Sequence, residues 1–198
     1  MARPITVAPP PHRALVAKVD AFDVAVRTRR AADMACRAGC SACCGQQLSV
    51  CDVEAALLRE GIDALDDEAR AGLALRLETV GPESACVFLD AAGRCAVYAS
   101  RPLVCRTQGL PLRYPNGVIP VSAVFLRRET VGSETVGSDV TWCPLNFRDA
   151  PPSPPDVIDA ARVDTMLALS NRDAGGDAER RTPLAELARA ALSDSVAR

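Results

Sequence analysis

Four cysteines lie within residues 36–44, which read C-R-A-G-C-S-A-C-C. A cysteine that serves only as a small buried hydrophobic residue has no reason to cluster in sequence, so packing does not explain this segment. Cys36, Cys40 and Cys43 are separated by four and three residues, a spacing that lets three thiols converge on one point. A glycine inside the segment and another directly after it permit the tight turns that thiolate ligation requires. The segment therefore indicates a metal site built from thiolates.

Histidine contributes little to this chemistry, because the chain has nine cysteines and a single histidine, His12. His12 follows three consecutive prolines, where we expect an extended and mobile backbone. We therefore do not expect His12 to be a ligand. The metal should be held by sulfur, with a carboxylate or a water molecule as the only complement.

Composition restricts the compartment and the partners. The net charge of -2 and the lack of a dense basic stretch argue against nucleic acid and against an anionic membrane surface. Residues 1–13 contain no apolar run of the length that a secretory signal needs, and no later run reaches the length of a membrane span. We expect a cytoplasmic protein. Because the cytoplasm is reducing and the cysteine count is odd, metal binding or redox chemistry explains the cysteines better than a disulfide framework.

Apolar residues at helical spacing, together with cap and stop residues, predict several helices. They are expected at residues 14–35, 52–60, 66–80, 156–171 and 183–192. The first helix leads directly into the thiol segment. The apolar stripes of the last two helices need a partner surface, which is either this domain or another subunit.

Two β-hairpins are expected between the helices. Residues 86–89 and 95–98 read as short strands around a glycine-containing turn, which would bring the cysteines of both strands close together. Residues 110–114 and 118–126 flank the turn Pro115-Asn116-Gly117 and predict the second hairpin. The expected fold class is α+β, a mostly helical small domain with two short hairpins that is organised around a thiolate metal site more than around a hydrophobic core.

Proline-rich segments suggest the domain boundaries. We expect a Pro-rich leader at residues 1–13, a cysteine-cluster metal-binding domain at 14–150, a Pro-rich linker at 151–155 and a C-terminal helical extension at 156–198.

A second concentrated pattern lies at residues 95–106, C-A-V-Y-A-S-R-P-L-V-C-R, after a Cys-Val-Phe-Leu segment at 86–89. Together with the four-cysteine segment it resembles the YkgJ-type cysteine-cluster family, which is described as a zinc- or iron-chelating domain. The resemblance spans roughly residues 36–143, and the joint occurrence of both motifs is far more specific than either one. It implies that the metal ligands are Cys36, Cys40, Cys43, Cys44, Cys86, Cys95, Cys105 and Cys143. Cys51 stands at the expected N-cap of a helix and is not expected to be a ligand.

Eight thiols suffice for two four-thiolate sites, or for one such site with the other cysteines in structural roles. Cys43 and Cys44 are adjacent, and adjacent side chains seldom point at the same ion in an extended or helical backbone, so one of them is expected to serve a second metal or the wall of a cluster. An iron-sulfur cluster or iron is the first expectation for the cofactor, and zinc is the alternative. Arg101 and Arg106 are expected beside the ligands, hydrogen bonded to thiolates or carbonyl groups.

Three functions are compatible with this pattern. The first is an iron-sulfur or iron-binding protein that acts in electron transfer, redox sensing or metal handling. The second is a zinc-stabilised interaction module that binds a protein partner through its C-terminal helices. The third is a cluster-dependent enzyme, because residues 36–43 also show the C-x-x-x-C-x-x-C spacing of radical S-adenosylmethionine enzymes. Against the third, Ala42 replaces the aromatic residue common in that family, and too little chain follows for a barrel.

Overall fold

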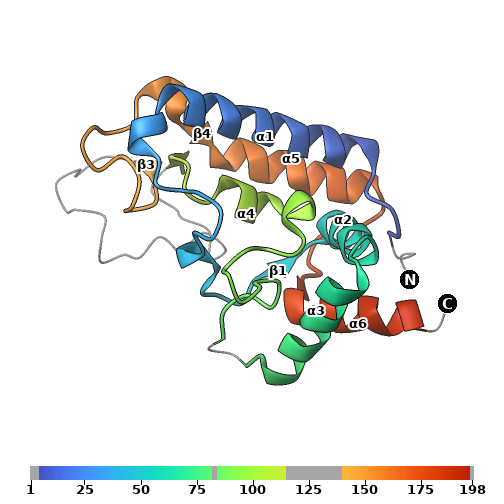
Figure 1. Cartoon of the computed structure of the whole chain (residues 1–198). Helices are drawn as coiled ribbons and strands as arrows, with labels where there is room; N and C mark the ends of the chain where they lie inside the picture. The colour runs from blue at the N-terminus through green and yellow to red at the C-terminus, as the bar shows by residue number, and fades with distance from the viewer. Residues whose placement is uncertain (1–4, 82–83, 115–139, 197–198) are drawn as a thin grey trace. The chain divides into compact units, whose positions relative to one another are not determined.

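The computed structural model of the chain describes residues 5–81, 84–114 and 140–196 (Figure 1). They form two compact units, each built from segments that are distant in sequence. Unit 1 comprises residues 1–13, 38–102 and 168–198. Unit 2 comprises residues 14–37 and 103–167.

Helices make up most of the regular structure. They are α1 (Pro10–Arg29), α2 (Asp52–Asp63), α3 (Asp67–Thr79), α4 (Leu103–Thr107), α5 (Ala160–Asp173) and α6 (Leu184–Val196). In unit 1, strand β1 (Ser49–Val50) pairs antiparallel with β5 (Thr182–Pro183). In unit 2, β2 (Leu112–Arg113) pairs antiparallel with β3 (Val140–Thr141) and parallel with β4 (Ile158–Asp159). The predicted α+β class with a helical majority is confirmed.

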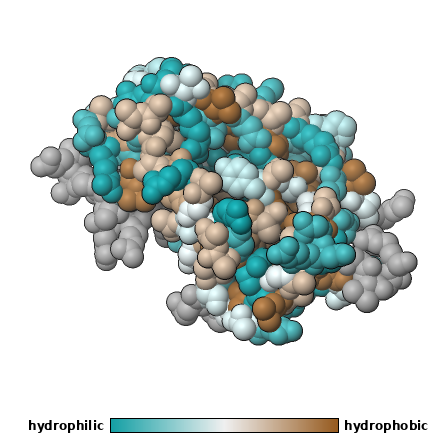
Figure 2. Space-filling view, in the orientation of Figure 1, coloured by the Kyte–Doolittle hydropathy of each residue, from teal (hydrophilic) through white to brown (hydrophobic). Residues whose placement is uncertain are grey.

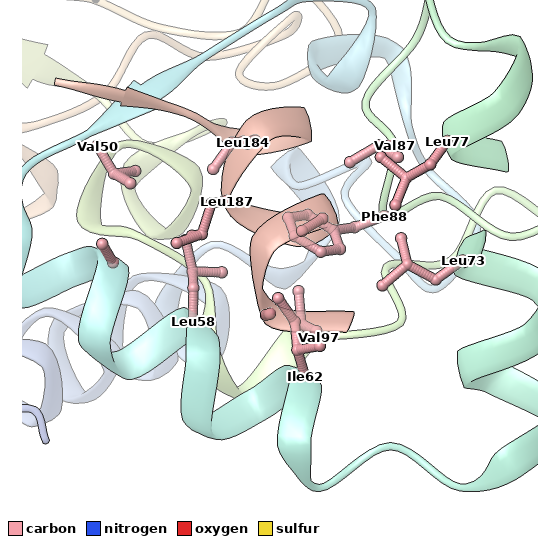
Figure 3. Close-up of a cluster of buried hydrophobic side chains, with 13 residues drawn as sticks. Val50, Leu58, Ile62, Leu73, Leu77, Val87, Phe88, Val97, Leu184 and Leu187 are labelled. Atoms are coloured by element: carbon pink, nitrogen blue, oxygen red, sulfur yellow. The ribbon is translucent and has the colours of Figure 1, made fainter. Parts of the chain in front are cut away.

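Unit 1 is held together by an apolar core to which α2, α3 and α6 all contribute (Figure 3). Leu58 of α2, Leu73 of α3 and Leu187 of α6 are buried in it, together with Phe88 from the loop that follows α3. Helix α3 begins where its N-cap residue Asp66 accepts a hydrogen bond from a backbone N–H of the first turn, at 2.8 Å. Unit 1 thus has a hydrophobic core of its own.

The apolar stripe of α6 is part of this core. Leu184, Leu187, Ala188 and Ala191 are all buried, and Arg189 on the same helix donates a hydrogen bond to the carbonyl oxygen of Leu77, at 3.1 Å. Of the two partner surfaces considered for this stripe, the structure supports the one within the same unit.

Unit 2 combines smaller apolar clusters with buried ion pairs. Leu15 and Val19 of α1 pack with residues of α4, β2, β4 and α5, and α1 and α5 lie side by side (Figure 1). Arg106 of α4 is almost fully buried and contacts both carboxylate oxygens of Asp20 at 2.7–2.8 Å. This pair links the buried guanidinium group of α4 to the partly exposed Asp20 of α1.

Helix α1 begins at Pro10, earlier than predicted, and the side chain of His12 is fully buried. The expectation of an extended, mobile backbone at His12 is therefore wrong. Proline is tolerated in the first turn of a helix because its missing N–H would have no helical partner there and its φ is already helical. The prolines before His12 are thus compatible with a helix start.

The first predicted hairpin is reduced to a loop with one isolated bridge, between Leu89 and Cys95. Val87 and Phe88 are consecutive and both buried, whereas successive residues of a strand point to opposite faces. The core therefore favours a turn over a regular strand at this point. In the second predicted hairpin, β2 forms within residues 110–114, and the expected return strand at 118–126 lies outside the described residues.

On the face shown in Figure 2, hydrophobic residues lie scattered among hydrophilic ones. Large exposed hydrophobic side chains include Val24 of α1, Leu75 of α3 and Met166 of α5. Among the described helices, none combines the length and the apolar composition needed to cross a membrane.

Candidate metal centre

The eight predicted ligands are divided between the two units. Unit 1 contains Cys40, Cys43, Cys44, Cys86 and Cys95, and unit 2 contains Cys36, Cys105 and Cys143. None of these cysteines is fully buried. Cys51 differs from all of them, because it is buried at the N-cap of α2 and burial raises the pKa of its thiol to about 12.

Short backbone contacts bring the cysteines of unit 1 together. A 3-10 turn at Ala42–Cys44 is closed by a hydrogen bond from the N–H of Cys44 to the carbonyl oxygen of Ser41, at 2.8 Å. The N–H of Cys86 then donates to the carbonyl oxygen of Cys44, also at 2.8 Å. The segment at residues 86–89 is therefore hydrogen bonded directly to the four-cysteine segment.

Two glycines allow a close approach between residues 38–45 and the loop at 90–94. Gly93 has a positive φ of 71°, and a β-carbon at this position would lie 3.1 Å from the carbonyl oxygen of Gly39. Gly39 also has a positive φ, of 83°. The carboxylate of Asp90 accepts hydrogen bonds from two N–H groups of the same loop and fixes the turn that leads to Cys95.

The thiols of unit 1 influence one another. A hydrogen bond with the Cys44 side chain is the largest of the effects that raise the pKa of Cys43. Burial raises the pKa of Cys86 and of Cys95, and each of these sulfurs also feels a further acidic group, Cys95 in the first case and Asp90 in the second. The side chains of Cys43 and Cys44 are thus in contact with each other. The two residues occupy a 3-10 turn, whereas the prediction from sequence assumed an extended or helical backbone.

Two arginines lie close to these thiols. Arg101 lowers the pKa of Cys43 and Cys95, and Arg76 lowers the pKa of Cys86 and Cys95, although the raising effects are larger. The guanidinium group of Arg101 is stacked 3.6 Å from the ring centroid of Tyr98, which holds the arginine in place. This arrangement agrees with the expectation that Arg101 lies beside the ligands.

The sequence did not indicate a role for Arg76, which reads as an ordinary polar residue near the end of a helix. It donates a hydrogen bond to the carbonyl oxygen of Val87, at 2.8 Å, and this contact places its charge near the loop that carries Cys86. Arg106, which was expected beside the ligands with hydrogen bonds to a thiolate or a carbonyl group, pairs with Asp20 of α1 in unit 2.

In unit 2, the thiol of Cys36 contacts the side-chain amide of Asn146, with Nδ2 3.3 Å from Sγ. The backbone N–H of Asn146 donates to the carbonyl oxygen of Cys143, at 2.9 Å. Asn146 therefore connects two of the three cysteines of this unit, and it was not recognised from sequence.

The donors in both units are chemically suited to a thiophilic metal, because sulfur is the ligand preferred by zinc, copper(I) and iron-sulfur clusters. In residues 5–81, 84–114 and 140–196, however, no group of three or more His, Cys, Asp or Glu side chains is arranged to hold a metal ion. The ligand atoms are thus of the type that such a metal prefers. The described thiols lie near one another, but they do not form a closed ligand shell.

A family model described as "CxxCxxCC: Putative zinc- or iron-chelating domain" matches residues 35–118. No match to a curated protein or to a solved structure was found. The matched range contains every cysteine of the chain except Cys143. It includes both the four-cysteine segment and the motif at residues 95–106, and the match supports metal binding through cysteine. The family model that matches residues 35–118 is thus that of the cysteine-cluster family that the sequence resembles.

Proposed function

We propose that this chain binds iron, as an iron-sulfur cluster or as an ion, and uses it in a redox or metal-handling role. The observation that carries the proposal is the grouping of Cys43, Cys44, Cys86 and Cys95 in one unit, with two arginines beside them. Cys40 belongs to the same glycine-lined segment and completes the proposed ligand set of unit 1. The ligands proposed in unit 2 are Cys36, Cys105 and Cys143.

The chemistry of grouped thiols supports a metal. A thiol that lies near another thiol has a raised pKa, so its thiolate form is disfavoured. A bound cation reverses this effect because it attracts the negative charge. Arg101 and Arg76 add positive charge that offsets the excess negative charge of a four-thiolate centre. Neutral thiols alone would not need that compensation.

A functional metal agrees better with this arrangement than a purely structural one. Unit 1 has an apolar core that includes residues from three helices, and Cys86 and Cys95 pack only at its edge. Cys43 is exposed to solvent. A centre near the surface is accessible to an electron-transfer partner or to an exchanging metal ion, whereas a small zinc domain typically depends on its metal to fold.

The contact between Cys43 and Cys44 favours a cluster over a single ion. Two adjacent thiolates crowd one small ion, but in a cluster each can bind a different iron atom. Cluster ligation is thus the form of the proposal that uses both sulfurs.

The proposal is tested by measuring iron, zinc and acid-labile sulfide in protein purified without air, together with its visible absorption. We expect a brown protein that contains iron, with sulfide if the centre is a cluster. A colourless protein with stoichiometric zinc would contradict the iron proposal and favour the zinc-stabilised module. Protein that holds neither metal, even after reconstitution with iron and sulfide or with zinc, would contradict metal binding altogether.

A further inference from the structure

Asn146 is a buried polar residue of unit 2 for which the sequence indicated no role. Only 1% of its surface is exposed, and it lies outside the matched range 35–118. A buried side-chain amide is costly unless its donors and acceptor are satisfied, so its partners define its role.

Two backbone groups fix the orientation of this amide. The N–H of Ala35 can only donate, and it lies 2.8 Å from Oδ1. The carbonyl oxygen of Gly109 can only accept, and it lies 2.8 Å from Nδ2. Because these partners have opposite and fixed polarity, the oxygen and nitrogen ends of the amide cannot be exchanged.

The second hydrogen of Nδ2 is left to face sulfur. Nδ2 lies 3.3 Å from Sγ of Cys36, while Oδ1 lies farther from the same sulfur, at 3.8 Å. The residue that precedes Cys36 is the one whose N–H is bound by Oδ1, so the amide holds both the backbone and the thiol of this segment.

The space around this contact is closely filled. Gly109 has a φ of 91°, and a β-carbon there would lie 2.7 Å from Sγ of Cys36 and 3.2 Å from Nδ2 of Asn146. The glycine therefore leaves room for the sulfur and the amide to meet.

We infer that Asn146 is the positioning residue for Cys36 as a metal ligand: it fixes the direction of the sulfur and donates an N–H hydrogen bond to it. This inference rests on the proposed function. A hydrogen bond from a fixed amide orients a thiolate ligand and stabilises its negative charge, and loss of such a partner typically costs about 10- to 100-fold in metal affinity.

Asn171 provides a matched control. It is also buried, its Oδ1 accepts from the N–H of Val53 at 3.2 Å, and its Nδ2 donates to the carbonyl oxygen of Asp177 at 2.9 Å. Asn171 thus bridges two backbone groups as Asn146 does, and neither of these two partners is a sulfur. Its replacement reports the structural cost of losing a buried amide.

The experiment titrates full-length protein with cobalt(II) alone in the absence of air, and follows the thiolate-to-cobalt absorption bands. Four variants are compared with the unchanged chain: Cys36→Ser, Asn146→Asp, Asn171→Asp and Asn146→Ala. Asp keeps the acceptor of Asn146 but removes its donor, and Ala removes the donor without adding a charge, so that one variant serves if the other fails to fold by circular dichroism.

We expect Asn146→Asp to weaken cobalt binding about 10- to 100-fold and to reduce the bands that Cys36→Ser abolishes, while Asn171→Asp binds as the unchanged chain does. Unchanged binding in both Asn146 variants would overturn the inference, and so would equal losses in the Asn146 and Asn171 variants. If Cys36→Ser retains all cobalt, the inference fails but metal binding by unit 1 stands. If the unchanged chain binds no cobalt, the proposed function fails, and the inference with it.

Discussion

In unit 1 the thiol of Cys43 contacts the thiol of Cys44, whereas in unit 2 the thiol of Cys36 contacts the side-chain amide of Asn146. The first arrangement opposes ionisation of the sulfur, because one thiol neighbours another. The second places a neutral side-chain amide beside the sulfur, with Nδ2 at 3.3 Å. Similar cysteines thus have different local environments in one chain.

The two units also differ in what stabilises them. Unit 1 depends on an apolar core to which three helices contribute. Unit 2 has smaller apolar clusters and buries charge, as in the pair of Arg106 with Asp20 and the capping box at Ser153 and Asp156. We therefore expect unit 1 to respond most strongly to loss of apolar surface and unit 2 to loss of specific polar contacts.

The largest expected effect tests the core of unit 1. Ending the chain at Pro183 removes α6, and its two buried leucines, Leu184 and Leu187, account for a loss of at least about 4 kcal/mol in the free energy of unfolding at roughly 2 kcal/mol each. We expect unit 1 to lose cooperative unfolding in urea, followed by circular dichroism.

The control for this truncation is Met166→Ala, which removes an exposed apolar side chain from α5. It should change the free energy of unfolding by no more than about 0.5 kcal/mol. A truncated chain that unfolds at the same urea concentration as the full chain would show that residues 184–198 are dispensable for the fold.

The next effect separates the thiols by unit. Cys95→Ser should abolish the metal bound in unit 1, and Cys105→Ser should abolish that bound in unit 2, because serine is a poor ligand for thiophilic metals. Cys51→Ser should retain the metal, since Cys51 is a buried N-cap residue and its thiol stays protonated with a pKa of about 12. Metal content per chain, measured after gel filtration without air, gives the result.

The pattern among these three variants decides the assignment. If all three variants retain metal equally, Cys95 and Cys105 are not ligands. Loss of all metal in Cys95→Ser and again in Cys105→Ser would indicate that both cysteines serve one centre. Partial and different losses would indicate separate centres.

Two arginines of the same motif should differ in the property that they affect. Arg101→Gln removes the positive charge beside Cys43 and Cys95, and we expect metal affinity to fall by about tenfold with little change in unfolding. Arg106→Gln breaks the ion pair between the buried Arg106 and Asp20 and should lower the free energy of unfolding by about 1–3 kcal/mol. Chelator competition and urea unfolding on both variants provide the comparison, and the reverse pattern would contradict it.

The parts of the fold that follow local rules could be predicted from the sequence. The start of α3 is an example, because Asp66 caps a backbone N–H only three residues away. The four-cysteine segment could also be predicted from the sequence, since the spacing of its cysteines lies within nine residues. The start of α1 at Pro10 was missed because the prolines were interpreted as an extended leader, although proline also fits a first helical turn.

Contacts between distant residues could not be predicted in the same way. Asn146 meets Cys36 across 110 positions, and Arg106 meets Asp20 across 86. Nothing in the local sequence distinguishes Arg106, which pairs with an acid, from Arg101, which stacks on Tyr98 near the thiols. The β-hairpin predicted at residues 86–98 is reduced to an isolated bridge, because burial of consecutive residues in the core outweighs strand propensity.

The smallest expected effect concerns a polar contact of unit 1. Asp52, at the start of α2, accepts hydrogen bonds from Nε and Nη2 of Arg180 at 2.8 and 2.7 Å, and these bonds are the main reason that the pKa of Asp52 lies below its ordinary value of 3.8. A carboxylate with a lowered pKa in the folded state stabilises the fold fully above its unfolded pKa, and this contribution is lost as the pH falls through the folded pKa. Asp52→Asn should therefore unfold at lower urea than the unchanged chain at neutral pH, and the two should converge below about pH 4. Asp194→Asn, which removes an exposed carboxylate paired with Arg59, should follow the unchanged chain at each pH. A difference for Asp52→Asn that stays constant across this range would show that the charge of Asp52 contributes nothing to unit 1, which would leave its apolar core as the source of its stability.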